Sequence, residues 1–471
     1  MAMYPGELND VNICNIFSGA ADLNTRMLRC ADHTLYAYAI DGLTAANTIS
    51  EYIVKPIMQD LAGTDMQQLY DRALHGVVVN LVAKPCKNLD EVAQFLVNGF
   101  CVILFEGVGA IAFEAKTPEK RSLSGPELEH TAKGPKDAFV ETVRTNTSLI
   151  RRHLRTPDLR LWESTVGRRS LTNVTVVWIK GVTNQALVER MQHRLQSIDI
   201  DGLLSPSAVE EYITGSRRTA FPLLQYTERT DRFCTGLLRG RVGLLVDGLP
   251  LGYLTPVDVG YLMDSPEDRT RDYISASFVR VLRYGALMLS LLLPALYLAF
   301  TIHSPGWLPD HLRGIIEANA VPFSPIWEVL SLLVAFELLQ ESGVHLPQSV
   351  GQSVSIIGGI VVGSAGVEAG LISAIALIVV SIAGVCGFVL PNRDLAAAIR
   401  IWRMILAASA AVAGLPGLAI GAVALFIHVL RLRSLGVPYL RFRSTGILQK
   451  RFAAQKYRDS ALKPENSKNQ Q

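Results

Sequence analysis

The sequence predicts an α+β cytosolic domain, made of two related α/β subdomains, followed by an all-α polytopic membrane domain. Charge distribution is the first reason: residues 284–430 hold only 4 basic and 7 acidic side chains, whereas residues 1–283 hold 31 and 33. The second reason is a pair of sequence patterns that occurs twice in the front part. The whole chain is 49% apolar and 18% charged, below the roughly 25% charged residues of soluble domains. This composition excludes a disordered chain and argues against a wholly soluble one.

The charge pattern divides the chain into three parts. A cytosolic N-terminal domain is expected at 1–283, a transmembrane domain at 284–430, and a basic cytosolic tail at 431–471, which holds 10 basic and 2 acidic residues. The opening residues MAMYPGELNDVN have no basic segment followed by an apolar one, so no cleaved signal peptide is expected. The six cysteines form no CxxC motif, and we expect reduced, structural thiols.

The front domain contains two copies of one pattern. The segment NGFCVILFEGVGAIAF at 98–113 matches RGRVGLLVDGLPLGYL at 239–254, and LYAYAIDGLTAAN at 35–47 matches VTVVWIKGVTN at 174–184. The two pairs are offset by 141 and 139 residues. An acidic residue and a glycine between apolar runs predict a hairpin, because both turn residues need positive φ.

The duplication sets the expected subdomain boundaries. We predict α/β subdomains at about 22–118 and 170–262, joined by a helical linker at 126–163. Within that linker the pattern predicts a helix at Pro135–His153, which ends in the basic run Arg151–Arg155. This run could meet acidic lipid, nucleic acid or a partner, or it could be a solvated or intramolecularly paired helix end.

Four stretches of the second part are apolar enough to enter a bilayer: Tyr284–Ile302, Pro322–Glu341, Val354–Leu390 and Met404–Leu430. The first has 19 residues without a charge and would span about 28 Å as a helix. The third is too long for one span, so it should break at the glycines of 366–370. We therefore predict about four spans plus one broken or re-entrant segment.

Arginines set the expected orientation. They precede the first stretch and follow the last one, so both termini should be cytosolic and the number of crossings even. Arg393, Arg400 and Arg403, between the third and fourth stretches, complicate this prediction. Four full spans would place them outside, whereas a re-entrant third stretch or an interfacial helix at 393–403 would keep them inside.

Small residues in the third stretch are candidates for helix packing. Gly359 and Gly363 form one GxxxG pair, and Gly366 and Gly370 form a second. Such rows let helix backbones approach closely in lipid, within the chain or between subunits. The alternative is that small residues are simply common in membrane helices.

Three carboxylates in apolar surroundings are candidates for an ion path or for polar contacts between helices: Glu337, Glu368 and Glu328. A carboxylate in a bilayer costs several kcal/mol, so it usually faces a bundle interior or water. Glu328 and Glu337 are nine residues apart and lie on opposite faces of a helix. An interfacial glutamate, or one paired with arginine, is the simpler interpretation.

No motif predicts an enzyme, a metal site or a bound cofactor. The sequence lacks GxxxxGK[ST], a GxGxxG after a strand, HExxH and GxSxG, and its histidines are scattered. No nucleophile, base or metal set stands out, and no inverted repeat of the kind found in transporters is convincing. The basic tail is expected to track anionic membrane lipid, and without interleaved aromatic residues no nucleic-acid binding is expected.

Taken in order, several segments resemble the A subunit of the GerA-type nutrient germinant receptors of endospore-forming bacteria, over about residues 12–445. The matching segments are DGLTAANTISEYIVKPI at 41–57, GPKDAFVETVRTNTSLIRRHLRTPDL at 134–159, RLQSIDIDGLL at 194–204, FPLLQYTERTD at 221–231, GRVGLLVDGLP at 240–250, DYISASFVRVLRYGALMLSLLLPALYLA at 272–299, LPQSVGQSVSIIGGIVVGSAGVEAGLIS at 346–373 and LGVPYL at 435–440. Thr230, where a proline is usual, and Gln340–Pro347, where two arginines are usual, depart from the family pattern.

The resemblance implies a function. Such A subunits sit in the inner spore membrane with a transporter-like B subunit, thought to bind the nutrient, and a lipoprotein C subunit. The A subunit is thought to form a homo-oligomeric ring that acts as a nutrient-gated ion channel. The 322–341 and 354–370 helices would then build the conducting or packing core. An accessory sporulation paralog of the A subunit, or a non-conducting scaffold for receptor assembly, remains the alternative.

Overall fold

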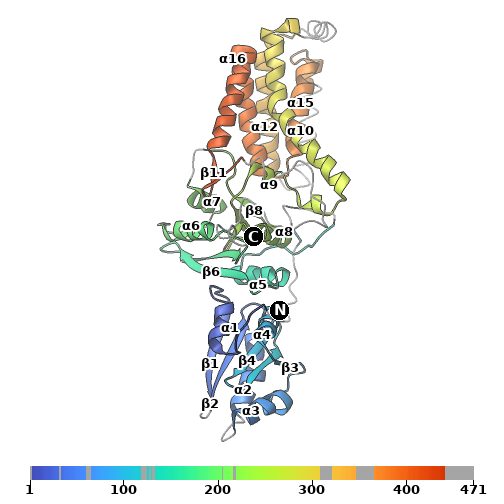
Figure 1. Ribbon diagram of the computed structural model, residues 1–471. Helices are drawn as coiled ribbons and strands as arrows, with labels where there is room; N and C mark the ends of the chain where they lie inside the picture. The colour runs from blue at the N-terminus through green and yellow to red at the C-terminus, as the bar shows by residue number, and fades with distance from the viewer. Residues whose placement is uncertain are drawn as a thin grey trace. The chain divides into compact units, whose positions relative to one another are not determined.

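The structure is a computed structural model that describes residues 3–30, 33–59, 65–117, 125–126, 129, 133–203, 205–215, 219–307, 321–345 and 365–440 (Figure 1). It divides into two compact units. Among the described residues, unit 1 holds those up to Gly215 together with Leu224–Pro256, and unit 2 holds those of 219–223 together with those from Val257 onward.

Unit 1 is built from two antiparallel sheets of five strands each. The first sheet contains β1 (Leu23–Cys30), β2 (His33–Ile40), β3 (Ala83–Cys86), β4 (Phe100–Phe105) and β5 (Gly109–Glu114), in the order β1-β2-β4-β5-β3. The second contains β6 (Leu159–Val166), β7 (Thr172–Ile179), β8 (Gln225–Thr227), β9 (Val242–Val246) and β10 (Gly252–Thr255), in the order β6-β7-β9-β10-β8. The two strand orders are the same, so the predicted duplication is confirmed.

The helices repeat as well. The first repeat has α1 (Asp10–Ile16), the π-helix η1 (Thr48–Val54), α2 (Lys55–Gln59), α3 (Met66–Arg72), the π-helix η2 (Ala73–Val77) and α4 (Leu89–Val97). The second has α5 (Val143–His153), α6 (Gln185–Gln196), α7 (Pro206–Thr214) and α8 (Thr230–Leu238). Because α1 packs on α4 and α5 packs on α8, α5 is the first element of the second repeat.

The expected linker therefore differs from the observed one. The helix predicted from Pro135 starts at Val143, and β6 already begins at Leu159. The backbone before α5 is extended because it pairs with the second repeat: Phe139 N–H donates to the Glu228 carbonyl (2.7 Å), and Gly248 N–H donates to the Glu141 carbonyl (2.7 Å). These distant partners have no local signal in the sequence.

The two predicted hairpins form, but in each turn only the glycine, and not the acidic residue before it, has the positive φ that the prediction assigned to both. Gly107 follows Glu106 between β4 and β5 with φ +80°, and Gly248 follows Asp247 between β9 and β10 with φ +84°. Residues with a Cβ rarely adopt this conformation. Each glycine thus reverses an apolar strand onto its neighbour.

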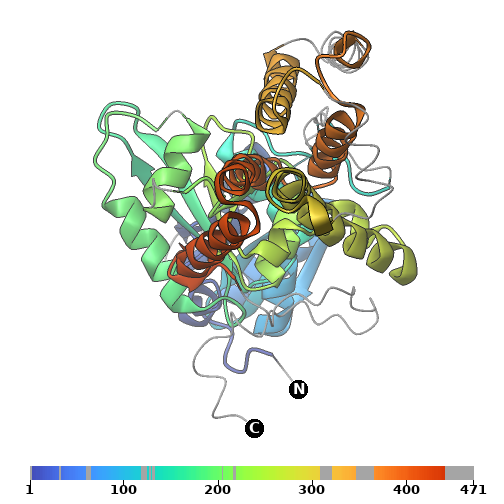
Figure 2. The same cartoon turned by 90° about the horizontal axis from the view of Figure 1, so that it is seen from above.

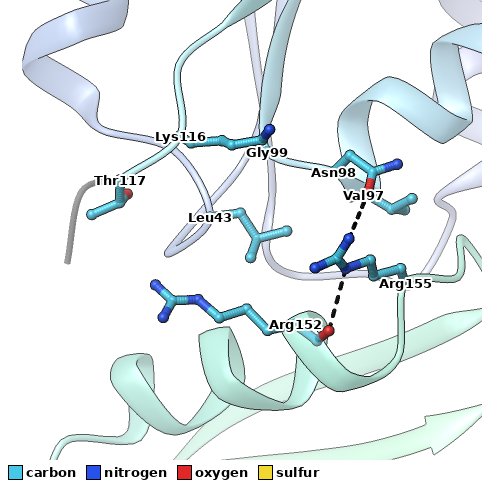
Figure 3. A pocket seen from close by; sticks show the side chains of 8 residues that line it. All are labelled: Leu43, Val97, Asn98, Gly99, Lys116, Thr117, Arg152 and Arg155. Carbon is cyan, nitrogen blue, oxygen red and sulfur yellow. Dashed lines mark hydrogen bonds between the residues drawn. The ribbon is translucent and has the colours of Figure 1, made fainter. Parts of the chain in front are cut away.

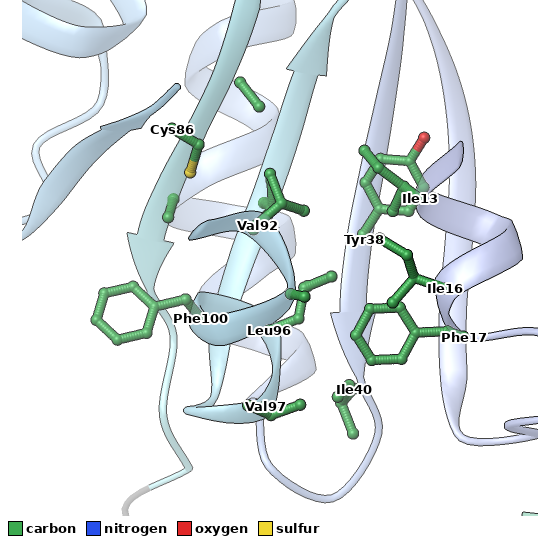
Figure 4. Close-up of a cluster of buried hydrophobic side chains, with 14 of the residues drawn as sticks. Ile13, Ile16, Phe17, Tyr38, Ile40, Cys86, Val92, Leu96, Val97 and Phe100 are labelled. Carbon is green, nitrogen blue, oxygen red and sulfur yellow. The ribbon is translucent and has the colours of Figure 1, made fainter. Parts of the chain in front are cut away.

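Helices cover both faces of the first sheet. On one face, α1 and α4 bury a cluster that includes Ile13, Phe17, Tyr38 and Leu96 (Figure 4). On the other face, η1, α2 and α3 bury a second cluster around Ile53, Leu69 and the other side of β4. All six residues of β4 are buried, which explains why this strand reads as a continuous apolar run.

The two repeats are joined by polar contacts at the start of their first strands. Ala21 N–H donates to the Leu161 carbonyl (2.9 Å), and the Arg160 guanidinium donates to the Ile16 carbonyl (2.8 Å). Arg151 of α5 donates two hydrogen bonds, of 2.6 and 2.8 Å, to the carboxylate of Asp22. Arg151 is 0% exposed and Asp22 is 5% exposed, so this ion pair is buried between the repeats.

Unit 2 is helical, and its long helices run side by side (Figures 1 and 2). They are α10 (Tyr273–Leu298), continued by the π-helix η4 (Ala299–His303), α12 (Pro325–His345), α15 (Ala374–Phe388) and α16 (Arg393–Arg431). The short elements are α9 (Val259–Leu262), η3 (Pro266–Arg269), η5 (Pro305–Trp307), α14 (Gly366–Glu368), β11 (Arg433–Ser434) and β12 (Val437–Pro438). The helical second part of the prediction is confirmed.

Helix α10 starts earlier than the predicted span at Tyr284. Asp272 caps it by accepting a hydrogen bond from Ser275 N–H (3.0 Å). The arginines of its first turns are neutralised: Arg280 pairs with Asp264, and Arg283 lies 2.5 Å from Asp268. The helix can therefore begin before the charge-free stretch.

Helix α16 is a hairpin of two arms, 393–413 and 415–431. Gly414 interrupts it with φ 64° and ψ −140°. A Cβ on Gly417 would overlap the Ser409 carbonyl, and one on Gly421 would lie 2.8 Å from Leu406. The rings of Trp402 and His428 are 5.5 Å apart, a distance that only an antiparallel fold-back allows. The sequence indicated an interruption here but not a reversal.

The contacts also order the ends of the helices. His303, at the end of η4, contacts Ala411 and Gly414 at the tip of the hairpin. At the opposite end, the segment after α16 packs on the segment before α10, where Ser434 Oγ accepts from Val257 N–H (2.9 Å). Arg393 and Arg431 therefore lie at the end of unit 2 where α10 starts.

Within the described ranges, two helical stretches, Tyr273–His303 and Arg393–Arg431, are long and apolar enough to cross a membrane, judged by length and composition alone. Ala374–Phe388 is apolar but shorter. The stretch Arg393–Arg431 is the α16 hairpin, whose two arms are 393–413 and 415–431.

Candidate functional site

Helices α12 and α16 bring four polar side chains together inside the apolar helical unit. Glu337 and Gln340 lie about one turn apart on α12, and Arg400 and Arg403 lie about one turn apart on α16. Arg400 Nη1 lies 3.3 Å from Glu337 Oε1 and also donates to Gln340 Oε1. We call these four residues the charged cluster.

The charged cluster lies one turn beyond the apolar core of the unit. Leu333 of α12 and Ala407 of α16 belong to that core; Glu337 follows Leu333 by four residues, and Arg403 precedes Ala407 by four. Side chains four residues apart share a helix face. The packing that buries Leu333 and Ala407 thus turns Glu337 and Arg403 inward as well.

Burial differs within the charged cluster. The side chains of Glu337 and Arg400 are 38% and 26% exposed, whereas Arg403 is 1% exposed. Glu337 Oε2 and the Nε atoms of Arg400 and Arg403 are buried without a hydrogen-bond partner among the described residues. The geometry can hold an ion pair between two helices, and it leaves hydrogen-bonding capacity unused.

Glu328, the second predicted carboxylate, lies elsewhere. It is 3% exposed and accepts a hydrogen bond from the backbone N–H of Ser373, the N-cap of α15. A carboxylate is favoured at a helix N-terminus by the unpaired N–H groups and the helix dipole. Glu328 thus links α12 to the start of α15.

Glu368, the third carboxylate, is the exposed last residue of the short helix α14. Gly370 ends that helix with φ +66°, and Leu371 N–H donates to the Gly366 carbonyl (3.0 Å). This is a Schellman cap, which favours glycine. The third stretch is therefore interrupted here, at the place the sequence indicated.

The predicted glycine packing is only partly visible. Gly359 and Gly363 lie outside the described residues. A Cβ on Gly366 would meet Ile372 of the same segment, and one on Gly370 would meet nothing within 4 Å. Packing of these glycines against another helix stays a prediction. Within the described part of unit 2, the closest contacts between glycines and another helical segment are those of the α16 hairpin.

A second candidate site is a basic pocket of about 300 Å³ in unit 1, between the two repeats (Figure 3). Its lining comes from the first repeat and from the end of α5: Leu43, Val97, Asn98, Gly99, Lys116, Thr117, Arg152 and Arg155. Arg155 donates to the Asn98 side chain (3.4 Å) and to the Arg152 carbonyl (3.3 Å). Three cations and an amide suit a small anionic group such as a carboxylate.

The basic run Arg151–Arg155 therefore divides into two roles. Arg151 is the buried partner of Asp22, whereas Arg152 and Arg155 line the pocket. In the alignment of the repeats that matches Asp22 with Asp158, Gly19 takes the place of Arg155 and Ile16 that of Arg152. The first repeat thus has no equivalent basic helix end.

Sequence reasoning treated Arg400 and Arg403 as orientation signals and missed the pairing of Arg400 with α12. Their spacing of three residues, which places both on one helix face, was the available signal. Among the described residues, no group of three or more His, Cys, Asp or Glu side chains could hold a metal ion.

These features define a two-part chain, in which a duplicated α/β unit precedes an apolar helical unit with internal charges. Its family follows from comparison with known proteins. The model for Bacillus/Clostridium GerA spore germination proteins matches residues 11–462. The chain belongs to this family, so the resemblance found in the sequence is confirmed.

The chain is also similar to individual known proteins. Spore germination protein A1 of Bacillus subtilis (strain 168) is 34% identical over 420 residues, which cover 88% of this chain and 86% of that protein. The uncharacterized membrane protein YfkQ of the same organism is 32% identical over 405 residues, which cover 85% of this chain and 78% of that protein. The crystal structure of the N-terminal domain of the A subunit of the Bacillus megaterium spore germinant receptor GerK3 covers 52% of this chain and 92% of that chain, at 26% identity and a TM-score of 0.41.

Proposed function

We propose that this chain is the A subunit of a spore nutrient germinant receptor, and that its helical unit forms an ion path in the inner spore membrane that nutrient opens. Family membership supports the receptor role. The observation that carries the ion path is the charged cluster. Charged residues within membrane helices are expensive and usually mark ion or substrate paths, and Arg403 is 1% exposed inside an apolar bundle.

The position of the arginines supports a topology with both termini in the cytosol. Arg280, Arg393 and Arg431 lie at the same end of unit 2, and positive residues favour the cytosolic side. The N-terminal domain, residues 1–283, is then cytosolic, residues 284–430 are embedded in the membrane, and the basic tail at 431–471 follows the anionic lipid surface.

The receptor would contain further subunits. We infer a transporter-like B subunit and a lipoprotein C subunit from the resemblance of the sequence, together with further copies of this chain in a ring. An oligomer gives each charged cluster equivalent neighbours around one path. A non-conducting scaffold or an accessory sporulation paralog predicts the same membrane location without ion flow.

Potassium release from dormant spores tests the proposal. Deletion of the chain should abolish nutrient-triggered release for at least one nutrient, and re-expression should restore it. Unchanged release with every nutrient would contradict the receptor role. Conductance of the purified chain in a lipid bilayer separates a channel from a scaffold, because a scaffold carries no current.

Two carboxylate variants sharpen the test. Glu337→Gln should alter release because Glu337 pairs with Arg400 of the facing helix, whereas Glu368 is exposed at the end of α14 and Glu368→Gln should leave release near wild type. Equal behaviour of the two variants, at equal protein abundance, would contradict the role of the charged cluster.

A second candidate function, ligand sensing, is favoured by the basic pocket of unit 1. Lys116, Arg152 and Arg155 suit a small carboxylate, such as an amino acid. A carboxylate that binds there should raise the thermal unfolding temperature of the purified full chain. Arg155→Gln should remove this rise, and Arg168→Gln, an exposed arginine outside the pocket, should retain it.

A further inference from the structure

Two buried atoms of the charged cluster are complementary but not bonded to each other. Glu337 Oε2 is an acceptor without a partner, and Arg403 Nε is a donor without one. Arg403 makes no hydrogen bond or ion pair with any residue that the structure describes, although the charge of Glu337 acts on it. An arginine that is 99% buried and unpaired is rare in proteins.

Leaving these groups unpaired is unfavourable. A buried polar group without a hydrogen bond destabilises the state that contains it, and an unpaired buried charge does so more strongly. A second arrangement, in which Glu337 bonds to Arg403, would satisfy one donor and one acceptor that this arrangement leaves unused. It would release Arg400, which is partly exposed and keeps Gln340 as a partner.

The helix geometry makes the second arrangement reachable. Arg400 and Arg403 are three residues apart on α16, so they share a face and are separated by about 4.5 Å along the helix axis. A shift of α12 along α16 by less than one turn would therefore move Glu337 from one guanidinium to the other. One-turn shifts between packed helices are a known form of two-state transition.

The neighbouring core allows such a shift. The buried α16 residues of the core near Arg403 are small, Ala407 and Ala411, and the partly buried Met404 packs against this core. Small residues present a smooth helix surface, over which the larger Leu333 of α12 can change its position. The two arginines thus offer Glu337 two alternative binding positions, and the alanines allow α12 to shift between them.

We propose that Glu337, Arg400 and Arg403 form a two-position latch that sets the open and closed states of the ion path. In the closed state, seen here, Glu337 is held by Arg400; in the open state it is held by Arg403, which is thus a positioning residue. This inference rests on the proposed channel function. It assigns opposite effects to two arginines that are one turn apart.

The test compares Arg400→Gln and Arg403→Gln in dormant spores that carry the full chain, with potassium release as the readout. Arg400→Gln removes the closed-state partner, so release without nutrient should rise at least about fivefold, the lower end of typical coupling between states. Arg403→Gln removes the open-state partner, so nutrient-triggered release should fall at least about fivefold without spontaneous release.

Three further variants act as controls. Arg403→Lys keeps the charge and should restore part of the triggered release. Arg393→Gln, an exposed arginine at the start of α16, should release potassium like the wild type. Glu337→Gln in combination with either arginine variant should make the two indistinguishable, because the shared partner is gone.

The outcomes separate the latch from the channel. If both arginine variants change release in the same direction, or neither does at normal protein abundance, the latch is wrong while the channel role stands. If deletion of the chain leaves every nutrient response intact, the proposed function itself is wrong.

Discussion

The two repeats of unit 1 fill the same layer of their cores in different ways. In the first repeat, Val92 of α4 packs with Val102 and Ala110 of the sheet. Leu104 pairs with Ala110 in the first repeat, and Leu245 pairs with Gly252 in the second. In the corresponding alignment, Phe233 of α8, Gly243 and Gly252 take the places of Val92, Val102 and Ala110. There, a Cβ on Gly252 would lie 2.6 Å from the Phe233 ring, and one on Gly243 would overlap it.

The difference shows what the duplication has kept. One repeat fills the layer from the strands, and the other fills it with the ring of Phe233 from the helix, beside the ring of Phe139. Interiors are packed at nearly constant density, so a gain on one side must be matched by a loss on the other. Strand order is common to both repeats, whereas the side chains that fill this layer are not.

The first helices differ in a second way. Helix α5 of the second repeat also contacts the first repeat, because its Arg151 pairs with Asp22. In α1 the equivalent position, by the match of Asp22 with Asp158, is Asn15. The second repeat therefore supplies the positive charge that neutralises buried Asp22 of the first repeat.

The largest expected effect comes from breaking this asymmetric contact. Arg151→Met leaves Asp22 buried without its partner and should lower the free energy of unfolding by about 3–5 kcal/mol. Arg168→Gln breaks an exposed ion pair with Asp199 and should cost at most about 1 kcal/mol. Chemical denaturation of the purified full chain, followed by circular dichroism, measures both. Equal effects would mean that the repeats do not depend on the buried pair.

A double-mutant cycle tests the difference in packing between the two repeats. Phe233→Val opens a cavity and should cost about 3 kcal/mol, and Gly243→Val overfills the layer and should cost about 1–3 kcal/mol. Together they place valine at two of the three equivalent positions, as in the first repeat. The double variant should therefore be more stable than the sum predicts by about 1–3 kcal/mol, and strict additivity in denaturation curves would contradict the volume exchange.

A smaller effect separates two equivalent turns. Gly42 and Gly181 both have positive φ, +76° and +74°, so alanine should cost about 1–2 kcal/mol at either. A Cβ on Gly42 would also overlap Ser148 Oγ of α5, whereas a Cβ on Gly181 would meet no other atom within 4 Å. Gly42→Ala should therefore lower the unfolding temperature more than Gly181→Ala. The reverse order would argue against α5 resting on the first repeat.

The smallest effect depends on pH and belongs to the second repeat alone. His153, at the end of α5, lies 2.5 Å from Asp137, and this hydrogen bond raises the pKa of His153. Burial pushes the pKa of Asp137 up, but the hydrogen bond and charge of His153 leave it below its ordinary value. Asp231 also acts on His153.

The sign of the pH effect follows from these directions. The stabilisation from His153 is fully present below its unfolded pKa of about 6.5 and is lost as pH rises through the higher folded pKa. The stabilisation from Asp137 is lost as pH falls below about 3.9. His153→Gln should thus destabilise the chain most between about pH 4 and 6.5 and least in alkaline solution. A thermal-unfolding difference that does not vary with pH would contradict this assignment.

The duplication could be predicted because its signals are local. Glu106-Gly107 and Asp247-Gly248 specify hairpin turns through the conformation of single residues. The start of α5 could not be predicted, because Phe139 and Glu141 are held extended by backbone partners about 90 to 110 residues away. The offset between the two apolar patterns gave no hint of the helix that begins each repeat.

The candidate site was predictable in part for the same reason. The apolar surroundings of Glu337 marked it as unusual, but its partner depends on the packing of α12 against α16. Pro416 and Gly417 indicated a break, and both a kink and a reversal suit a proline near a helix start. Only the contact of Gly417 with Ser409 decides between them.

The reversal at Gly414 bears on how the chain would be inserted into a membrane during synthesis. A single long helix would have to carry Arg393, Arg400 and Arg403 across, or leave them stranded on the far side from Arg431. A hairpin needs to translocate only its tip, where Ala411, Gly414 and Gly417 carry no charge. In the proposed topology, both basic ends of the hairpin would stay in the cytosol, and the two arms would enter the bilayer together.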